Sequence, residues 1–292
     1  MISTSGPLID KLLETNAARL EKFERTEAGD AKKPAHLPAS AGGRRYGTIK
    51  QKEDSRDYSF VASFRNSIPQ KVDLRSTGFL GPVLNQGSAG TCSAHAAAAA
   101  LRYLLRKEHV QDFPPSRLFV YYTTRVNIEG ISPEIDSGCV LRDVCRALQK
   151  FHTCNERYMA YSDTQITERP PALAVANARL HTTFAYRAVE QTLSALRGAL
   201  ATGYPVIVGI QVYQTFESEE VANTGVVPMP SHNEECLGGH AVLLVAYDDE
   251  TRTFTLQNSW GEWGQDGFFS LPYDYLIDTG LAGDFWCLTR FA

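Results

Sequence analysis

The spacing of hydrophobic residues changes about two thirds of the way along the chain, from a helical period to an alternating one. Before that point the pattern predicts helices over 91–107, 117–125, 140–151 and 192–202. After it, the pattern predicts strands over 205–213, 241–247, 253–258, 267–271 and 285–289. Helices followed by strands are typical of the α+β class, so we expect a helical half, a sheet half and a cleft where the two meet.

The first 66 residues differ from the rest in pattern and in charge. A narrow hydrophobic stripe predicts a helix over 8–26, and a stretch rich in Gly, Ala, Pro and charge predicts a linker over 27–45. Residues 1–66 hold 12 Lys and Arg against 9 Asp and Glu, whereas residues 67–292 hold 17 against 24. We therefore expect an N-terminal extension over 1–66 that could dock on an acidic domain over 67–292. The aromatic residues that could anchor its polar second half are Tyr46, Tyr58, Phe60 and Phe64.

The composition is that of a globular protein, with 292 residues, 43% of them hydrophobic, and a net charge of −4. The charge balance gives no reason to expect nucleic acid as a partner, and neither a signal peptide nor a membrane-spanning apolar run is visible. We expect a monomer with no membrane partner, either cytoplasmic or exported without a leader. The six cysteines include no CxxC pair, so mostly free thiols are expected, with a Cys236–Cys287 bridge as an open alternative.

The stretch from Asn85 to Thr91 is polar and rich in glycine, and it leads directly into Cys92 and an alanine-rich helix. The N-terminus of a helix presents free backbone N–H groups and a positive dipole end, which favour a thiolate over a thiol. Because the thiolate is the reactive form, Cys92 is a candidate nucleophile. The alternative is a cysteine that happens to lie near the start of a helix.

A cysteine nucleophile needs a base and a group that orients the base. His240 follows two glycines and precedes an apolar strand, where its side chain could face a cleft. A hairpin turn would return Asn258 to the same place, so that its amide accepts the second N–H of the imidazole. The amide of Gln86 and the backbone N–H of Cys92 could donate together to an oxyanion.

These residues stand in motifs that resemble the papain family of cysteine peptidases, over about residues 68–292. The matching stretches are Val72-Asp73-Leu74-Arg75, Asn85-Gln86-Gly87-Ser88-Ala89-Gly90-Thr91-Cys92, Gly238-Gly239-His240-Ala241-Val242 and Asn258-Ser259-Trp260-Gly261-Glu262-Trp263-Gly264. Shorter stretches, such as Arg56-Asp57-Tyr58 and Leu271-Pro272-Tyr273, are similar to those of bacterial, xylellain-like members. The resemblance implies an α+β papain-like fold, with a helical left half, an antiparallel β-barrel-like right half and the active-site cleft between them.

By this resemblance Cys92 is the nucleophile, His240 the general base and acid, Asn258 its orienting partner and Gln86 the oxyanion donor. Trp260 would shield the hydrogen bond between Asn258 and His240 from water. The remaining substrate-binding residues that the resemblance implies are Gly90 and Gly138 along the cleft, and Val140, Gly238, Gly239 and Ala241 near the pocket for the second residue before the scissile bond. No metal or other cofactor is implied.

The chain departs from the family pattern around the nucleophile. Ser93 and His95 stand where the family commonly has aromatic residues, and Ala89 replaces a cysteine that forms a disulfide there. His95 lies three positions after Cys92 on the same helix face, so it is either a rival base or a hydrogen-bonded core residue.

We therefore expect thiol-dependent hydrolysis of peptide bonds in peptide or protein substrates, through an acyl-enzyme on Cys92. Residues 1–66 precede the position where the family's mature domain begins, and such a segment is often a propeptide that covers the cleft. The extension is thus either an intramolecular inhibitor or a structural arm. The alternative functions are a catalytically silent papain-like binding protein and a cysteine amidase or acyltransferase that acts on a non-peptide amide.

Overall fold

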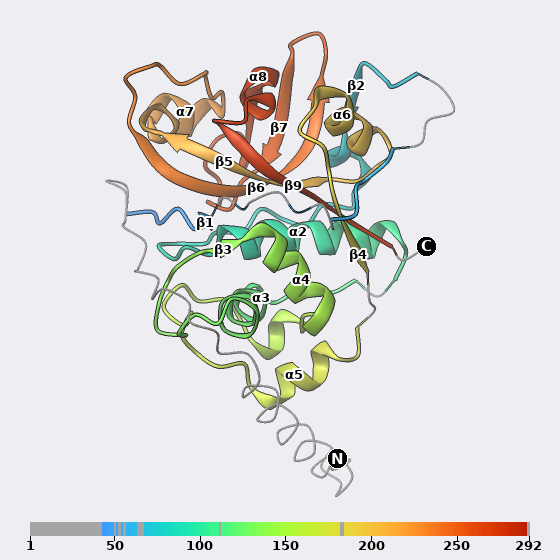
Figure 1. Cartoon of the computed structure of the whole chain (residues 1–292), viewed down its shortest axis with the longest axis vertical. Coiled ribbons are helices and arrows are strands. Elements are labelled where there is room, and N and C mark those ends of the chain that lie inside the picture. The colour runs from blue at the N-terminus through green and yellow to red at the C-terminus, as the bar shows by residue number, and fades with distance from the viewer. Residues whose placement is uncertain are drawn as a thin grey trace, which may run out of the picture.

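A computed structural model describes residues 43–49, 51, 54, 57–62, 67–110, 112–181 and 184–290. The helix expected over 8–26, most of the linker expected over 27–45, and Phe64 lie outside the described residues. The described chain forms a layer of helices and a layer of sheet, and helix α2 (Cys92–Lys107) runs along the boundary between them (Figure 1). This arrangement confirms the α+β class that the change in hydrophobic spacing predicts.

The helical layer is built around α2, whose buried alanines let strand β6 (Cys236–Asp248) pack closely against it. The helix expected after Ser116 begins as α3 (Arg117–Tyr122), and the Ser116 hydroxyl accepts the Phe119 N–H at 3.2 Å. It continues as a π-helical turn, which extends it beyond the expected end. The other elements of this part are the π-helical turn Thr123–Ile128, β3 (Cys139–Val140), α4 (Leu141–Phe151), the 3₁₀ turn Glu156–Tyr158 and α5 (Ala172–Ala178).

Seven strands form one antiparallel sheet in the order β4–β9–β5–β6–β7–β8, with β2 paired to the end of β6. Their bounds are β2 Lys71–Asp73, β4 Ala185–Ala188, β5 Val206–Tyr213, β7 Thr253–Gln257, β8 Phe268–Pro272 and β9 Ala282–Thr289. Short helical elements flank the sheet or join its strands: 3₁₀ turns at Leu74–Thr77 and Gln214–Glu217, and helices α6 (Leu193–Ala201), α7 (Glu219–Thr224) and α8 (Tyr273–Ile277).

The sheet is open, which corrects the expectation of a barrel-like half. Its two end strands are β4 and β8, and they do not pair with each other in the described part of the chain. The outer edge of β4 is occupied instead by the N-terminal extension, since the Phe60 N–H donates to the Ala188 carbonyl at 2.7 Å and the Ala188 N–H donates to the Tyr58 carbonyl at 2.8 Å. An edge that is already paired cannot close a barrel.

Strand β6 begins earlier than predicted, and this changes the setting of His240. The strand starts at Cys236 rather than at 241, so His240 lies inside it, opposite Ile210 of β5. Gly238 and Gly239 weaken the hydrophobic pattern but their backbones still pair with β5. The elements that were not predicted are all short: β1 (Thr48–Ile49), β3, β4, α5, α7 and α8.

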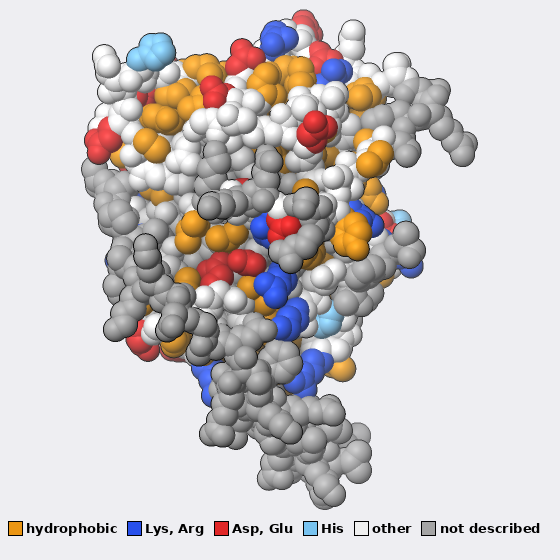
Figure 2. All heavy atoms as spheres, in the orientation of Figure 1, with side chains coloured by type: hydrophobic (Ala, Val, Ile, Leu, Met, Phe, Trp, Pro, Cys, Tyr) orange, Lys and Arg blue, Asp and Glu red, His pale blue; other side chains and the backbone are white. Residues whose placement is uncertain are grey.

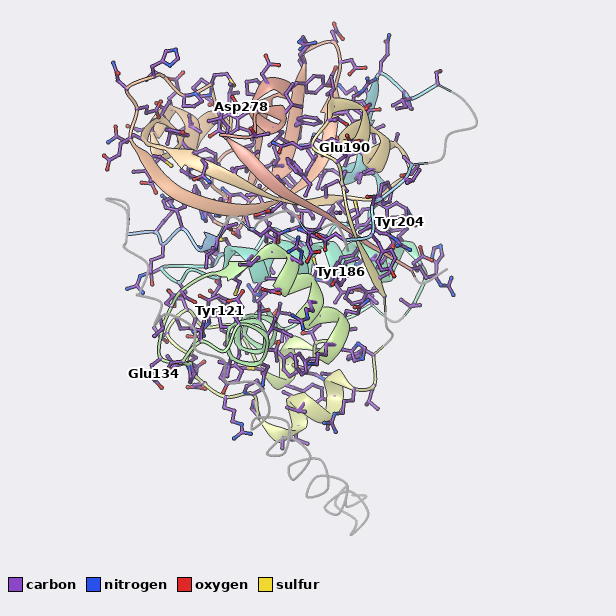
Figure 3. All side chains as sticks on the ribbon, in the orientation of Figure 1. Tyr121, Glu134, Tyr186, Glu190, Tyr204 and Asp278 are labelled. Atoms are coloured by element: carbon purple, nitrogen blue, oxygen red, sulfur yellow. The ribbon has the colours of Figure 1, made fainter. Side chains whose placement is uncertain are left out.

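Two aromatic residues of the extension pack as expected and a third does not. Tyr46 is buried, and the Phe60 ring meets the ring of Tyr204 edge-on at a centroid distance of 5.6 Å. Tyr58 is 74% exposed, so the expectation that it anchors the extension is wrong. Figure 3 shows Tyr204 and Tyr186 at the boundary between the two layers, on the side where β4 lies.

The six cysteines are free thiols, so the Cys236–Cys287 bridge does not form. Cys236 is exposed and pairs with Tyr213 at one end of β5, whereas the buried thiol of Cys287 donates to the Pro205 carbonyl beside the other end. The length of β5 therefore separates the two sulfurs.

Acidic, basic and hydrophobic side chains are interspersed over the face shown in Figure 2. Within the described ranges, no helix has both the length and the apolar character needed to cross a lipid bilayer.

Candidate active site

Cys92 is the first residue of α2 and is completely buried. Its Sγ lies 3.5 Å from the hydroxyl of Thr48, a residue of the N-terminal extension. Burial raises the pKa of the thiol, and this effect is opposed by the Thr48 hydroxyl and by the backbone N–H groups of Ala241, Gly47 and Ser93. The sulfur therefore faces several hydrogen-bond donors that would stabilise a thiolate. It is nevertheless shielded from water, because the residue is completely buried.

His240 and Asn258 meet across the β6–β7 hairpin, as the sequence predicts. Nε2 of His240 lies 2.8 Å from Oδ1 of Asn258, and the imidazole stacks on Trp260 at a centroid distance of 4.8 Å and an interplanar angle of 26°. Burial is the main cause that lowers the pKa of His240 to about 4, so the ring is neutral at pH 7. In that state Nε2–H donates to Asn258 and Nδ1 is the basic nitrogen.

The two halves of the site come together where α2 meets β6. The backbone N–H of Ala241, the residue directly after His240, faces the sulfur of Cys92. Nδ1 of His240 is buried and makes no hydrogen bond within the described residues. The structure thus places Cys92, at the start of α2, beside β6, the strand of the sheet layer that carries His240.

Gln86 is held in a fixed orientation by Ser259 and by the carbonyl of Ala89. Its side-chain carbonyl accepts the Ser259 hydroxyl at 2.6 Å, and its backbone N–H donates to the Ser259 carbonyl at 2.8 Å. The side-chain Nε2 donates one hydrogen to the Ala89 carbonyl at 2.8 Å. The carbonyl and amino ends of the side-chain amide are therefore distinguished by their partners, and the second N–H of Nε2 remains available as a donor.

His95, the rival base, uses both of its ring nitrogens within the protein. Nδ1 lies 3.0 Å from the Thr91 carbonyl, to which it must donate, and Nε2 lies 3.1 Å from the guanidinium of Arg117, from which it must accept. Burial, followed by the nearby charge of Arg117, lowers the pKa of His95 to about 3. The geometry favours the second expectation for His95, a hydrogen-bonded core residue.

Residues 44–49 of the extension fill the cleft above Cys92; the sequence suggested a covering extension but did not identify the residues that cover the cleft. Strand β1 runs parallel to β3, and the Cys139 N–H donates to the Gly47 carbonyl at 2.8 Å. A Cβ atom added to Gly138 would lie 1.9 Å from the Gly47 oxygen, and one added to Gly47 would lie 2.1 Å from the Gly90 oxygen. On the opposite wall, Cβ atoms at Gly238 and Gly239 would meet Tyr46 and Thr48 at 2.9 and 2.5 Å. The close fit explains why glycine is needed on both walls.

Charged and aromatic contacts hold this covering segment in place. The Tyr46 hydroxyl donates to Glu217, and its ring meets the His240 imidazole edge-on at a centroid distance of 6.0 Å. Arg44 lies over the Trp260 ring at 4.3 Å and 3.6 Å from Glu217. Arg45 pairs at 3.3 Å with Asp136, which is buried. The Asp136 carboxylate also accepts the Gly90 N–H at 2.9 Å. The segment is therefore anchored to both layers.

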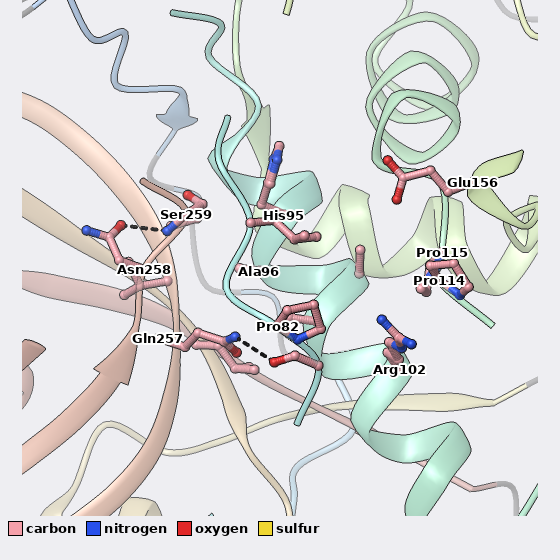
Figure 4. Close-up of a pocket in the computed structure, with 17 residues that line it drawn as sticks. Pro82, His95, Ala96, Arg102, Pro114, Pro115, Glu156, Gln257, Asn258 and Ser259 are labelled. Carbon is pink, nitrogen blue, oxygen red and sulfur yellow. Dashed lines mark hydrogen bonds between the residues drawn. The ribbon is translucent and has the colours of Figure 1, made fainter. Parts of the chain in front are cut away.

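A separate cavity lies beside α2, between the segment at Gly81 and Pro82 and the side chain of Gln257 (Figure 4). His95, Arg102, Glu156 and Asn258 line it, but Cys92 and His240 do not. Figure 4 shows Gln257 bonded to the carbonyl of Gly81 on one side of the cavity and Glu156 on the opposite side. The substrate cleft itself is closed because the covering segment occupies it.

A thiol-dependent hydrolase needs a thiol, an imidazole base and a group that orients the base. The two-layered α+β fold supplies a buried thiol at the start of a helix, a neutral imidazole and its amide partner. The chain belongs to the papain family of cysteine proteases, since the family model described as papain family cysteine protease matches residues 68–283. The resemblance, the papain-like fold and the enzyme class expected from the sequence are thereby confirmed, and the reaction is thiol-dependent hydrolysis of peptide bonds.

Three similar proteins show how far the likeness extends. The structure of xylellain, a cysteine protease from Xylella fastidiosa, is 33% identical and covers 90% of this chain and 100% of its own, with a TM-score of 0.79. The uncharacterized peptidase C1-like protein L477 of Acanthamoeba polyphaga mimivirus is 32% identical over 86% of this chain and 89% of its own length. Digestive procathepsin L2 proteinase from the Tenebrio molitor larval midgut, at 19% identity and a TM-score of 0.64, shares the fold over 99% of this chain and 95% of its own.

Proposed function

We propose that Cys92 is the nucleophile of this peptidase, with His240 as general base and acid, Asn258 as its orienting partner and Gln86 as an oxyanion donor. The observation that carries this assignment is the hydrogen bond between His240 and Asn258, which leaves Nδ1 as the basic nitrogen on β6, the strand that packs against the helix begun by Cys92. Trp260 stacks on the imidazole and shields this hydrogen bond from water.

The reaction then follows in two steps. The Cys92 sulfur, having lost its proton to His240, attacks the scissile carbonyl, and the oxyanion takes hydrogen bonds from the Gln86 amide and the Cys92 backbone N–H. The C–N bond breaks as His240 gives the proton to the leaving amine, and a thioester on Cys92 remains. Water, deprotonated by His240, attacks the thioester, and the C–S bond breaks to release the acid and the thiol.

The substrate backbone would lie where the covering segment now lies. We assign Gly90 and Gly138 to one wall, because both approach the backbone of Gly47 closely, and Gly239 to the other wall, because it approaches the Thr48 carbonyl. The residues assigned to the pocket for the second side chain before the scissile bond are Val140, Gly238, Gly239 and Ala241. The substrates are peptides or proteins that can extend along this groove.

The N-terminal extension acts as an intramolecular inhibitor in this proposal. Supporting it, the Cys92 side chain is 0% exposed beneath residues 44–49, and Thr48 lies against the sulfur. A structural arm would have no need to enter the cleft. Procathepsin L2, which by its name is a proenzyme, covers 99% of this chain.

The test compares four proteins: the full chain, a chain that starts at Ser67, and the Cys92→Ala variant of each. Turnover of a fluorogenic dipeptide panel and covalent labelling by an epoxysuccinyl inhibitor are measured. We expect turnover and labelling to be high in the chain from Ser67, low in the full chain and absent from both Cys92→Ala variants. Equal turnover by the two wild-type lengths would remove the inhibitory role, and turnover that survives Cys92→Ala would remove the assigned nucleophile.

A further inference from the structure

A directed chain of hydrogen bonds joins the residue before the nucleophile to the proposed oxyanion donor. The Tyr161 hydroxyl donates to the backbone carbonyl of Gln86 at 2.7 Å. The Thr91 hydroxyl lies 2.7 Å from the same Tyr161 oxygen and must be the donor there, because the single proton of Tyr161 is already used. One phenol thus holds Gln86 and Thr91 at a fixed separation on either side of the turn that leads to Cys92.

The ring of Tyr161 is itself held by charged and polar neighbours. Arg117 lies over the ring face at 4.3 Å, and the His95 imidazole meets the ring at a centroid distance of 4.7 Å and an interplanar angle of 84°. Arg117 also pairs with Glu156, which accepts the Tyr161 N–H at 3.2 Å. Each of these groups therefore touches Tyr161 or a residue that orients it.

His95 completes this arrangement because it offers Arg117 an acceptor. Its Nε2 accepts from Arg117 at 3.1 Å, while its Nδ1–H is tied to the Thr91 carbonyl at 3.0 Å. A phenylalanine at this position would fill the space but would leave the buried Arg117 without this partner. The polar side chain at position 95 is thus explained by its hydrogen bond with Arg117, and the place of Arg117 by its contact with the Tyr161 ring.

The other side of the turn is tied to the sheet layer. The Gln86 backbone N–H and side-chain carbonyl both bond to Ser259, the neighbour of Asn258. Gln86 is therefore held between Ser259 on the sheet side and Tyr161 on the helical side. If the Tyr161 hydroxyl is removed, the backbone carbonyl of Gln86 loses its tie to the helical layer, and the amide is oriented only by Ser259 and by the Ala89 carbonyl within the turn.

We propose that Tyr161 is a positioning residue for the oxyanion site, and that His95 and Arg117 hold its ring so that Gln86 Nε2–H and the Cys92 backbone N–H converge on one oxygen. This inference rests on the proposed roles of Cys92 and Gln86. It assigns no contact with substrate to Tyr161, His95 or Arg117.

The test removes only the hydroxyl, with Tyr161→Phe, and uses Tyr158→Phe as the matched control. The Tyr158 hydroxyl accepts from the neighbouring Arg157 at 2.8 Å, and among the described residues no hydrogen bond is found between it and the turn at 85–91. Both changes are made in the full chain carrying Gly47→Ala, which should displace the covering segment. The readouts are kcat and KM for a fluorogenic peptide, the inhibition constant of a peptide aldehyde, and the alkylation rate of Cys92 by iodoacetamide.

The peptide aldehyde forms a tetrahedral adduct that needs the oxyanion donors, whereas iodoacetamide alkylation needs only the thiolate. For Tyr161→Phe we expect kcat to fall about tenfold at nearly constant KM, aldehyde binding to weaken about tenfold, and alkylation to stay unchanged. His95→Phe should show the same selective loss, and His95→Gln, which keeps an acceptor for Arg117, should restore most of it. Unchanged aldehyde binding, or a parallel loss in all three readouts, would overturn the positioning role.

A second measurement does not require peptidase activity. Amide hydrogen exchange over residues 86–92 is compared in the otherwise unaltered full chain, where Tyr161→Phe should exchange faster than Tyr158→Phe. Equal exchange in the two variants would contradict the inference. If the Gly47→Ala parent hydrolyses no peptide and its Cys92 alkylates normally, the assigned peptidase roles fail, and the exchange experiment still decides whether Tyr161 holds the turn.

Discussion

Oδ1 of Asn258 lies 2.8 Å from Nε2 of His240, and the opposite nitrogen of the same ring has no hydrogen bond in the part of the chain that the structure describes. The contact selects the tautomer in which Nδ1 is basic, so one amide determines which nitrogen of His240 can accept a proton. The importance of this contact can be measured directly.

Asn258→Ala should lower kcat/KM by roughly 10- to 100-fold, since the imidazole loses both its orientation and the acceptor for its N–H. Asn223→Ala, at an exposed position on α7, is the matched control and should leave turnover within twofold. Steady-state kinetics on chains that start at Ser67 would measure both. If Asn258→Ala retained full activity, Asn258 would have no orienting role.

Gly47→Ala should raise the turnover of the full chain. The added Cβ would lie 2.1 Å from the Gly90 oxygen, closer than any contact between such atoms, so the segment must leave its place in the cleft. Gly280→Ala is the control, because Gly280 lies outside the segment, has no positive φ, and a Cβ there would meet only the exposed side chain of Asp278, at 3.1 Å. A full chain in which both variants have wild-type turnover would show that residues 44–49 do not limit access to Cys92.

Stability should fall with pH below about 6.5, because the two buried imidazoles stay neutral in the folded chain. The pKa of His240 is lowered to about 4 and that of His95 to about 3, both chiefly by burial, so the unfolded chain binds protons that the folded chain does not. Arg44 and Glu217 are the charges that act on His240, and they oppose each other.

His95→Gln isolates one of these imidazoles. Between pH 7 and pH 5 the wild-type chain should lose roughly 2 kcal/mol more unfolding free energy than His95→Gln, whatever the absolute stability of the variant. Urea unfolding at the two pH values gives both numbers. Parallel pH dependences in the two proteins would mean that the pKa of His95 is the same in the folded and the unfolded chain.

Glu129→Gln should stabilise the chain at alkaline pH. Burial raises the pKa of Glu129 to about 8; its Oε1 accepts the Val140 N–H at 2.9 Å and its Oε2 is buried without a partner among the described residues. The folded chain therefore holds a proton that the unfolded chain releases above about pH 4.5, and stability falls as pH rises towards 8.

An amide at this position can keep the contact with Val140 and does not ionise. Relative to its difference from wild type at pH 5, Glu129→Gln should gain roughly 3 to 4 kcal/mol at pH 9, as measured by urea unfolding. Glu134→Gln, on a nearby exposed turn, is the control and should show no pH-dependent gain. A constant difference at both pH values would contradict the buried, protonated state of Glu129.

The residues of the proposed site could be predicted where local chain geometry determines their place. Cys92 begins a helix that the alanine run announces, and a single hairpin returns Asn258 to His240. The covering segment could not be predicted in this way, because β1 has only two residues and docks on β3, which lies far away in the sequence. No hydrophobic period can develop over so short a strand.

The role of His95 remained open in the sequence for a similar reason. Its acceptor nitrogen is explained by Arg117, which the sequence places on a different helix, and by Tyr161, which follows after a further loop. Pairwise spacing along one helix indicated a rival base, whereas the three-dimensional neighbours use both ring nitrogens. Buried polar networks of this kind become visible only once the fold has brought the partners together.

Residues 44–49 are part of the same molecule as the cleft that they fill, so their occupancy does not depend on how much protein is present. A tethered ligand of this kind acts at an effective concentration that is roughly millimolar when the connecting chain is short. Dilution therefore leaves the cleft filled, and in the proposed inhibitory role a separate peptide would compete with a ligand that cannot diffuse away. Cutting the chain anywhere between Ile49 and Ser67 would turn this contact into an ordinary bimolecular one, which dissociates on dilution.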